Sequence, residues 1–360
     1  MHDIQLALRW VLFLVCCSFP LNAEASNSIR VGAYYFPGWS SSSEYWKDLE
    51  GQPGSRSTVP WPERMPLGGR YAEENQGTAD RHLIWAKTYG LSYFIYDWYW
   101  EQGREKSAHA VRNFLSSNER QGLQYMLLWA NHPRIDGESE FLTIVRHWAD
   151  YYLAHPEYLT IQGRPAVIVF SPDHLRNQLG GSRAVRQAFV AADQMLHKRG
   201  IPPIFWLGCA YPNQVGQLLK DGYAAATAYN YPRAGMGVSQ DRVAPYRTMI
   251  SGYEQYWHDF AADGRLLYWV PVSSGWDPRP WQGRAALIRP GSTPEAFGDM
   301  LIRALRFANA FPSLTNGMVV INAWNEFAEG ASIEPTEGWG FAYLAQVRKA
   351  LNAFLTHEQQ

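Results

Sequence analysis

Short apolar segments alternate with amphipathic segments along most of the chain. The apolar segments are rich in Val, Ile, Tyr, Phe and Trp and lack strict polar alternation, which is typical of strands covered on both faces. We expect eight such strands. They span residues 29–36, 91–97, 124–130, 165–170, 203–209, 223–229, 266–272 and 317–324.

Between these strands, apolar residues recur at the 3.6-residue spacing of a helix. The spacing predicts eight helices, at residues 78–88, 109–120, 140–153, 183–199, 213–219, 245–262, 294–310 and 343–354. Helix boundaries are marked by Ser182 before the fourth, Gly264 after the sixth and Thr293 before the seventh. Strict alternation of strand and helix predicts one α/β domain, a single (β/α)8 TIM barrel, over residues 26–360.

The first 25 residues have the pattern of a signal peptide. Arg9 precedes an apolar run over residues 10–21, and Ala23-Glu24-Ala25 forms a small-x-small cleavage site. The run is shorter than the ~20 apolar residues that a spanning helix needs. We therefore expect export to the periplasm or the medium, with no integral membrane segment in the mature chain. Cys16 raises a lipid-anchored form, which the bulky residue before it disfavours.

Composition points to a carbohydrate partner. Aromatic residues make up 15% of the chain, with 16 Trp and 21 Tyr, while charged residues make up only 18%. Trp and Tyr suit the apolar faces and polar rims of sugar rings, although most of them will pack the core. A formal net charge of -1 offers no basic field for nucleic acid. Metal-binding, nucleotide-cradle and serine-esterase motifs are missing from the sequence, so we expect no metal and no cofactor.

Candidate chemistry gathers where strands end, because barrel enzymes place their sites there. Glu326 and Glu329 follow the eighth strand, three residues apart, and Gly330 permits a sharp exit. In a helical turn this spacing puts both carboxyl groups on one side, and cleavage of a glycosidic bond needs two such groups. Proximity also raises one pKa, as a general acid requires. Solvated glutamates on a loop are the alternative, which the position after strand eight disfavours.

Further candidates for substrate binding lie at the other strand ends and in a long Ser-, Gly- and Pro-rich loop at residues 37–77, which would sit on the catalytic rim. Asp97 would orient a sugar hydroxyl or a catalytic group, or cap its loop. The Trp candidates would stack on sugars or pack the barrel mouth. The set comprises Tyr35, Trp39, Asp97, Trp98, Trp129, Asn131, Tyr229, Asn230, Trp276 and Asn325. Cys209, at the end of strand five, is expected to be a buried thiol.

The segment 320–330, VINAWNEFAEG, followed by Ile333-Glu334-Pro335, resembles the strand-eight signature of glycoside hydrolase family 99. That family contains the endo-α-mannosidases and bacterial polysaccharide-locus relatives often labelled glycosyltransferases. Supporting similarity lies in residues 32–39, 89–91, 129–131 and 164–165, so the resemblance spans most of the chain.

The resemblance implies a retaining, endo-acting glycosidase for α-mannoside-like linkages. Glu326 would be the base on the substrate 2-hydroxyl, giving a 1,2-anhydro sugar, and Glu329 would be the general acid/base. Phe327 and Ala328 stand where endo-mannosidases commonly carry Trp-His, which places the chain closer to the bacterial relatives. Two other functions stay open: a transglycosylase or glycosyltransferase of surface polysaccharide, and a non-catalytic carbohydrate-binding barrel.

Overall fold

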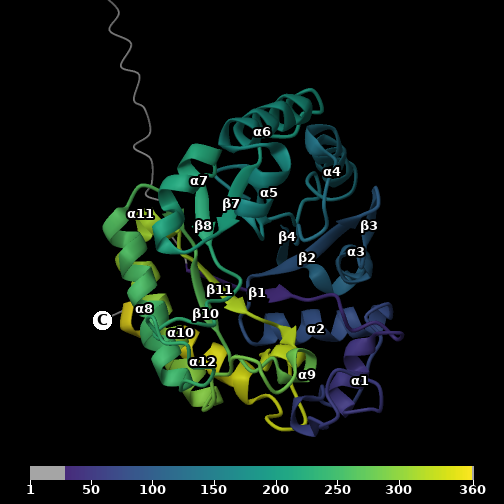
Figure 1. The fold of residues 1–360 in the computed structure, drawn as a ribbon, viewed down its shortest axis with the longest axis vertical. Helices are drawn as coiled ribbons and strands as arrows, with labels where there is room; N and C mark the ends of the chain where they lie inside the picture. The colour runs from purple at the N-terminus through teal and green to yellow at the C-terminus, as the bar shows by residue number, and fades with distance from the viewer. Residues whose placement is uncertain (1–28, 359–360) are drawn as a thin grey trace, which may run out of the picture.

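The computed structural model describes residues 29–358, so the predicted signal peptide lies outside the described residues. A barrel of parallel strands occupies the centre and helices surround it (Figure 1). The barrel strands are β1 (Arg30–Tyr35), β2 (Tyr93–Glu101), β4 (Gln124–Trp129), β6 (Arg164–Val169), β7 (Phe205–Cys209), β8 (Ala225–Thr227), β9 (Leu267–Tyr268), β10 (Val270–Ser273) and β11 (Met318–Asn322).

The barrel closes through a strand that is interrupted at one residue. β9 pairs in parallel with β8, and β10, directly after it, pairs in parallel with β11. Trp269 lies between them and donates its backbone N–H to the carbonyl of Ala226 at 2.9 Å. The predicted seventh strand is therefore one barrel position in two pieces, and the prediction of a (β/α)8 barrel is confirmed.

The eight predicted helices are present within a few residues of their expected bounds. They are α2 (Gln76–Thr88), α3 (His109–Ser116), α4 (Gly137–Tyr151), α6 (Ser182–His197), α7 (Val215–Asp221), α8 (Tyr246–Asp263), α10 (Pro294–Ala310) and α12 (Ala342–Glu358). Gly264 ends α8 with a left-handed φ of 63°, and the Thr293 side chain caps α10 by accepting from the Ala296 N–H. Ser182 was expected to precede its helix but is its first residue, because Gly181 occupies the cap.

Shorter elements decorate the barrel and were not predicted. Part of the 37–77 loop is regular, because Ser43 caps a short helix there. The added elements are α1 (Glu44–Glu50), α5 (Pro172–Leu179), α9 (Arg279–Gln282), α11 (Pro312–Thr315), the 3-10 turns η1 (Pro62–Arg64), η2 (Asn118–Arg120), η3 (Pro212–Gln214) and η4 (Phe327–Glu329), and the strands β3 (Arg104–Lys106), β5 (Thr160–Ile161), β12 (Asn325–Glu326) and β13 (Ala331–Ser332). No helix within residues 29–358 is long and apolar enough to cross a bilayer.

Two hydrophobic clusters hold the described chain together. The larger one fills the barrel and the layer between strands and helices. The smaller one joins the loop after β1 to the turn after β12, through Trp39, Trp46, Leu49, Phe327 and Ala328. This second cluster fixes the loop against the turn that carries the paired glutamates.

Close packing of α8 gives a stability prediction. A Cβ at Gly252 would lie 2.0 Å from the backbone nitrogen of Gly235, whereas a Cβ at Gly216 in α7 would meet nothing within 4 Å. Gly252→Ala should cost about 1–3 kcal/mol of unfolding free energy through overpacking. Gly216→Ala, the matched control, should be neutral or stabilising by up to about 1 kcal/mol, because Ala is the better helix former. Urea unfolding measures both, and equal effects would contradict the packing argument.

Candidate active site

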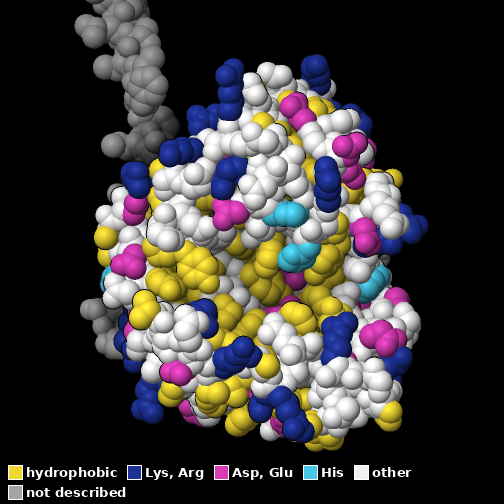
Figure 2. Space-filling model, in the orientation of Figure 1, with side chains coloured by type: hydrophobic (Ala, Val, Ile, Leu, Met, Phe, Trp, Pro, Cys, Tyr) yellow, Lys and Arg dark blue, Asp and Glu magenta, His cyan; other side chains and the backbone are white. Residues whose placement is uncertain are grey.

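A cleft of about 400 Å³ opens at the ends of the barrel strands. The face shown in Figure 2 is hollowed near its centre, and hydrophobic side chains wall much of the hollow. The cleft is lined by Phe36, Tyr45, Asp97, Tyr99, Leu128, Ala130, His132, Phe170, Tyr229, Asn230, Trp276, Trp281, Gln282, Glu326, Ala328 and Glu329.

The paired glutamates are carried by one tight turn. Glu326 ends β12, and the 3-10 turn η4 follows at once and ends at Glu329. Residues three apart eclipse one another in a 3-10 turn, so both carboxyl groups line the same cleft, as their spacing predicts. Gly330 then leaves the turn with a left-handed φ of 60°, which Gly adopts without strain. The carbonyl of Glu329 accepts from the Asp277 N–H at 2.6 Å, which holds the far end of the turn.

The pKa values of the two glutamates are both raised by burial, and their neighbours make these values differ. Glu326 is only 7% exposed, and burial raises its pKa to about 7. A hydrogen bond from Tyr229 opposes that rise and the charge of Glu73 adds to it. Burial, then the charges of Glu326 and Asp97, raise the pKa of Glu329 well above its usual range. One carboxyl therefore ionises near neutrality while the other keeps its proton, which is the division that an acid and a base need.

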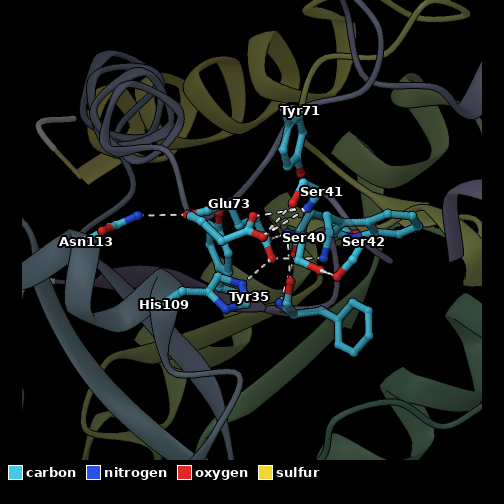
Figure 3. A network of polar contacts seen from close by, with 12 residues as sticks. Tyr35, Ser40, Ser41, Ser42, Tyr71, Glu73, His109 and Asn113 are labelled. Atoms are coloured by element: carbon cyan, nitrogen blue, oxygen red, sulfur yellow. Dashed lines mark hydrogen bonds and ion pairs between the residues drawn. The ribbon is translucent and has the colours of Figure 1, made fainter. Parts of the chain in front are cut away.

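A buried acid behind the cleft was missed by the sequence analysis. The Glu73 carboxylate is fully buried and lies amid polar groups from three segments (Figure 3). It accepts from the backbone N–H of Trp39 at 2.9 Å and from Asn325 Nδ2 at 3.1 Å, and it pairs with His109 Nε2 at 3.1 Å. Burial raises the pKa of Glu73, and the hydrogen bond from His109 opposes that rise.

Asn325 links Glu73 to the turn that carries Glu326 and Glu329. Its Oδ1 accepts from the Phe36 N–H at 2.8 Å, and its Nδ2 donates to the Phe36 carbonyl at 2.9 Å. The side chain is fully buried, so Asn325 fixes the backbone directly before Glu326 and makes no contact with the cleft. The structure thus places Asn325 outside the cleft, where it holds the turn.

Tyr35 lies on the far side of β1 from the cleft. Its hydroxyl pairs with His82 Nδ1 at 2.9 Å, and His82 Nε2 lies 3.1 Å from the Glu334 carboxyl. Tyr71 donates to the same carboxyl at 2.9 Å. These contacts turn the Tyr35 hydroxyl toward α2 and Glu334, so the structure does not place Tyr35 among the cleft residues.

Strand alternation corrects two Trp candidates. Side chains alternate between the faces of a strand, and in β2 it is Asp97 and Tyr99 that line the cleft. Trp98 therefore faces outward, and Trp129 in β4 does the same. Both pack against Trp148 of α4, with ring centroids 5.4 and 5.8 Å away, and each is 1% exposed. The structure therefore places both rings between the strands and α4 and not in the cleft.

Two more candidates have structural positions. Trp39 is fully buried in the smaller cluster, with its ring 4.5 Å from Trp46 and 5.1 Å from Phe327. The Asn131 amide clamps the backbone of Ser171, at 2.9 and 2.8 Å, and joins the ends of β4 and β6. Tertiary packing covers both side chains, so the structure does not place them among the cleft residues.

The structure brings the remaining candidates together. Asp97, Tyr229, Asn230 and Trp276 line the cleft beside the two glutamates. The sequence analysis missed the lining residues Tyr45, Tyr99 and Trp281. Tyr99 could have been predicted, because it lies two residues after Asp97 in the same strand and so faces the same side. Tyr45 could not have been predicted in this way, because only the folding of the loop at residues 37–77 brings it to the cleft.

The described residues include one free thiol and no cluster suited to a metal ion. Cys209 is free, and burial raises its pKa to about 12. Within residues 29–358, no group of three or more His, Cys, Asp or Glu is arranged to hold a metal ion.

Comparison with known proteins places the chain in a family. Residues 63–347 match the family described as Glycosyltransferase WbsX. The chain belongs to this family. It is also similar to the uncharacterized protein WxcX of two Xanthomonas campestris pv. campestris strains, each 28% identical over 291 residues. That match covers 74% of this chain and 40% of the relative, so the chain spans about two fifths of the length of these curated relatives.

Solved structures of glycosidases share the fold. The endo-α-mannosidase of glycoside hydrolase family 99 from Bacteroides thetaiotaomicron superposes with a TM-score of 0.66 at 14% identity, covering 92% of this chain and 99% of that one. A glycoside hydrolase-like protein superposes with a TM-score of 0.67 at 16% identity, covering 90% and 94%. Together with the WbsX match, they confirm the resemblance to a family-99-like barrel related to polysaccharide-locus proteins.

The raised pKa of Glu326 predicts a pH-dependent stability. A carboxyl whose pKa is higher in the folded state contributes stability that is fully present below about pH 4.5 and is lost as pH rises through about 7. Glu326→Gln stays neutral, so it should gain about 1–3 kcal/mol on the parent between about pH 5 and pH 8.

Denaturant unfolding at the two pH values measures this gain, with the exposed Glu138→Gln as the matched control. The control should differ from the parent equally at both pH values. If the unfolding free energies of Glu326→Gln and the parent changed with pH in the same way, folding would not raise the pKa of Glu326 and the prediction would be contradicted.

Proposed function

We propose that this protein cleaves glycosidic bonds inside an oligosaccharide or polysaccharide, with retention of configuration. One observation carries the proposal: two carboxyl groups on a single turn line an aromatic cleft, and burial raises the pKa of both while a hydrogen bond from Tyr229 lowers that of Glu326. The glycosidase-like barrel and the WbsX match support a carbohydrate-active enzyme. An α-mannoside-like linkage follows only from the resemblance to family 99.

In the proposed reaction, Glu326 acts first as base. It removes the proton from the substrate 2-hydroxyl as that oxygen bonds to the anomeric carbon, and Glu329 donates its proton to the departing glycosidic oxygen. Water then attacks the anomeric carbon of the 1,2-anhydro sugar and gives a proton to Glu329. The C1–O2 bond breaks, and O2 recovers the proton from Glu326. Both carboxyl groups end in their starting states.

The surrounding side chains suit these roles. Tyr229 donates to Glu326 Oε1 at 2.7 Å, which stabilises the ionised form that the base needs. The rings of Trp276 and Trp281 line the cleft and would offer apolar faces to sugar rings. Asn230 is half-buried at the same wall and would hydrogen-bond a hydroxyl.

The direct test is release of reducing ends by the purified protein from a panel of mannans, glucans and bacterial surface polysaccharides. Glu326→Gln and Glu329→Gln should each lower kcat by about 10²–10⁴-fold and leave KM nearly unchanged, because shape is kept and proton transfer is lost. Glu138→Gln is the matched exposed control and should behave as the parent.

The outcomes separate the functions. Full activity in either catalytic variant would remove that residue from the mechanism. Tight binding of one glycan with no release by the parent would favour the non-catalytic carbohydrate-binding barrel.

Glycosyl transfer is the second candidate, because the family that matches is described as a glycosyltransferase. A sugar hydroxyl would replace water in the second step, and the carboxyl groups would keep their roles. An acceptor oligosaccharide added to the same assay would then yield products longer than the substrate. The sequence contains no Gly-rich nucleotide cradle, which argues against a sugar-nucleotide donor.

Export remains part of the proposal, resting on the signal-peptide pattern of residues 1–25. A C-terminally tagged full chain should appear in the periplasm or the medium, shortened by about 25 residues at its N-terminus. Deleting residues 2–25 should keep it inside the cell. An uncleaved protein that stays in the cytoplasm would contradict export.

A further inference from the structure

The hydroxyl of Tyr229 faces two carboxyl groups with one hydrogen to give. Its oxygen lies 2.7 Å from Glu326 Oε1 and 3.0 Å from Asp97 Oδ2. A phenol carries a single donor hydrogen, so it can donate to only one of them. The other contact is attractive only where the carboxyl supplies the hydrogen. Two bare oxygens at 3.0 Å in a buried site would otherwise repel each other.

The geometry indicates which carboxyl holds the proton. The 2.7 Å contact to Glu326 has the short length of a hydrogen bond from a hydroxyl to an ionised acceptor, whereas the 3.0 Å contact to Asp97 is longer. Asp97 is 6% exposed, and its Oδ1 is shielded without a hydrogen-bond partner among the described residues. An ionised Asp97 would leave a charged oxygen buried and unsatisfied.

The surroundings of Asp97 oppose its charge from every side. The titratable groups that face it are the carboxyls of Glu326 and Glu329, the phenols of Tyr34, Tyr99 and Tyr229, and the thiol of Cys209. None of these groups carries positive charge, and burial lowers the pKa of His132, which lines the same cleft. Burial, followed by the charge of Glu326, raises the pKa of Asp97 well above its usual range.

We propose that Asp97 remains a neutral acid that donates its proton to the Tyr229 oxygen, so that the single phenolic hydrogen is committed to Glu326. The hydrogen bonds then run in one direction, from Asp97 to Tyr229 to Glu326. Asp97 is a positioning residue, since it acts on Glu326 through Tyr229. Its effect on turnover rests on the proposed glycosidase function, but the location of the proton does not.

Infrared spectroscopy tests the proton directly, without a substrate. At about pH 8, where ordinary carboxyl groups are ionised, a protonated acid still gives its own carbonyl band. Asp97→Asn should remove one protonated-acid band from the spectrum of the parent. Asp299→Asn, an exposed site on α10, is the matched control and should leave these bands unchanged. Loss of a carboxylate band in Asp97→Asn would overturn the proposal.

Kinetics on the substrate found in the reducing-end assay supply the second test. Asn is neutral and keeps an N–H donor for Tyr229, so Asp97→Asn should leave the acidic limb of the pH profile in place whatever kcat it loses through its position in the cleft. Asp97→Leu, which has no donor, should lower kcat below that of Asp97→Asn and move the acidic limb upward by less than Tyr229→Phe does, because the Tyr229 oxygen loses the hydrogen bond that polarises its O–H toward Glu326.

An ionised Asp97 predicts the opposite shift. Asp97→Asn would then remove a negative charge beside Glu326 and move the acidic limb down by about one pH unit or more, which would overturn the proposal. Tyr229→Phe serves as the reference for a lost hydrogen bond to Glu326 and should move the limb upward. If no glycan is cleaved, the proposed function fails while the infrared result still decides the protonation of Asp97.

Discussion

Burial of like-charged acids at the barrel mouth constrains everything around them. Asp97, Glu326 and Glu329 line one cleft, Glu73 lies behind it, and within residues 29–358 no Lys or Arg forms an ion pair with any of the four. Several carboxylates cannot ionise together in such a space, so protons must stay on some of them. Neutral donors decide which ones ionise: the Tyr229 phenol serves Glu326, while the Trp39 amide and Asn325 serve Glu73. For Asp97, Glu326 and Glu329, differential protonation therefore arises from hydrogen bonding, burial and mutual repulsion, whereas Glu73 also pairs with His109.

The buried acid Glu73 also connects the loop after β1 to the turn that carries Glu326 and Glu329. Carboxylate oxygens only accept, so Glu73 forces Asn325 to present its Nδ2 inward, and this orientation matches the acceptor and donor of the Phe36 backbone. The Trp39 indole N–H also donates to the backbone carbonyl of Asn325 at 2.7 Å, which adds a second link between the loop and this residue. The loop after β1, which brings Tyr45 to the cleft, is thus anchored on the residue directly before Glu326. A change that frees Glu73 would loosen the wall and the base together.

The sequence predicts what repeats along the chain and misses what depends on distant contacts. Alternating strands and helices specify the barrel, and the spacing of Glu326 and Glu329 after the last strand specifies the pair. Trp98 and Trp129 were chosen by residue type, without regard to the alternation of side chains along a strand. Each directly follows a cleft residue, Asp97 or Leu128, and so faces the opposite side of its strand. Glu73 was out of reach, since an acid in a Ser-rich loop resembles a solvated one. Its burial depends on Asn325, 252 residues further along the chain.

The two names that surround this chain, glycoside hydrolase and glycosyltransferase, describe reactions that share their first half. In the proposed mechanism, hydrolysis and transglycosylation would both begin with Glu326 and Glu329 opening a glycosidic bond, and they would differ in whether water or a sugar hydroxyl takes the anomeric carbon. The cleft adjoins a second hollow of about 220 Å³ across Phe170, Tyr229 and Asn230. An acceptor sugar would therefore have space next to the cleft. The outcome then depends on how firmly this hollow holds an acceptor, so a barrel with a hydrolase-like site is physically compatible with a family of transferases.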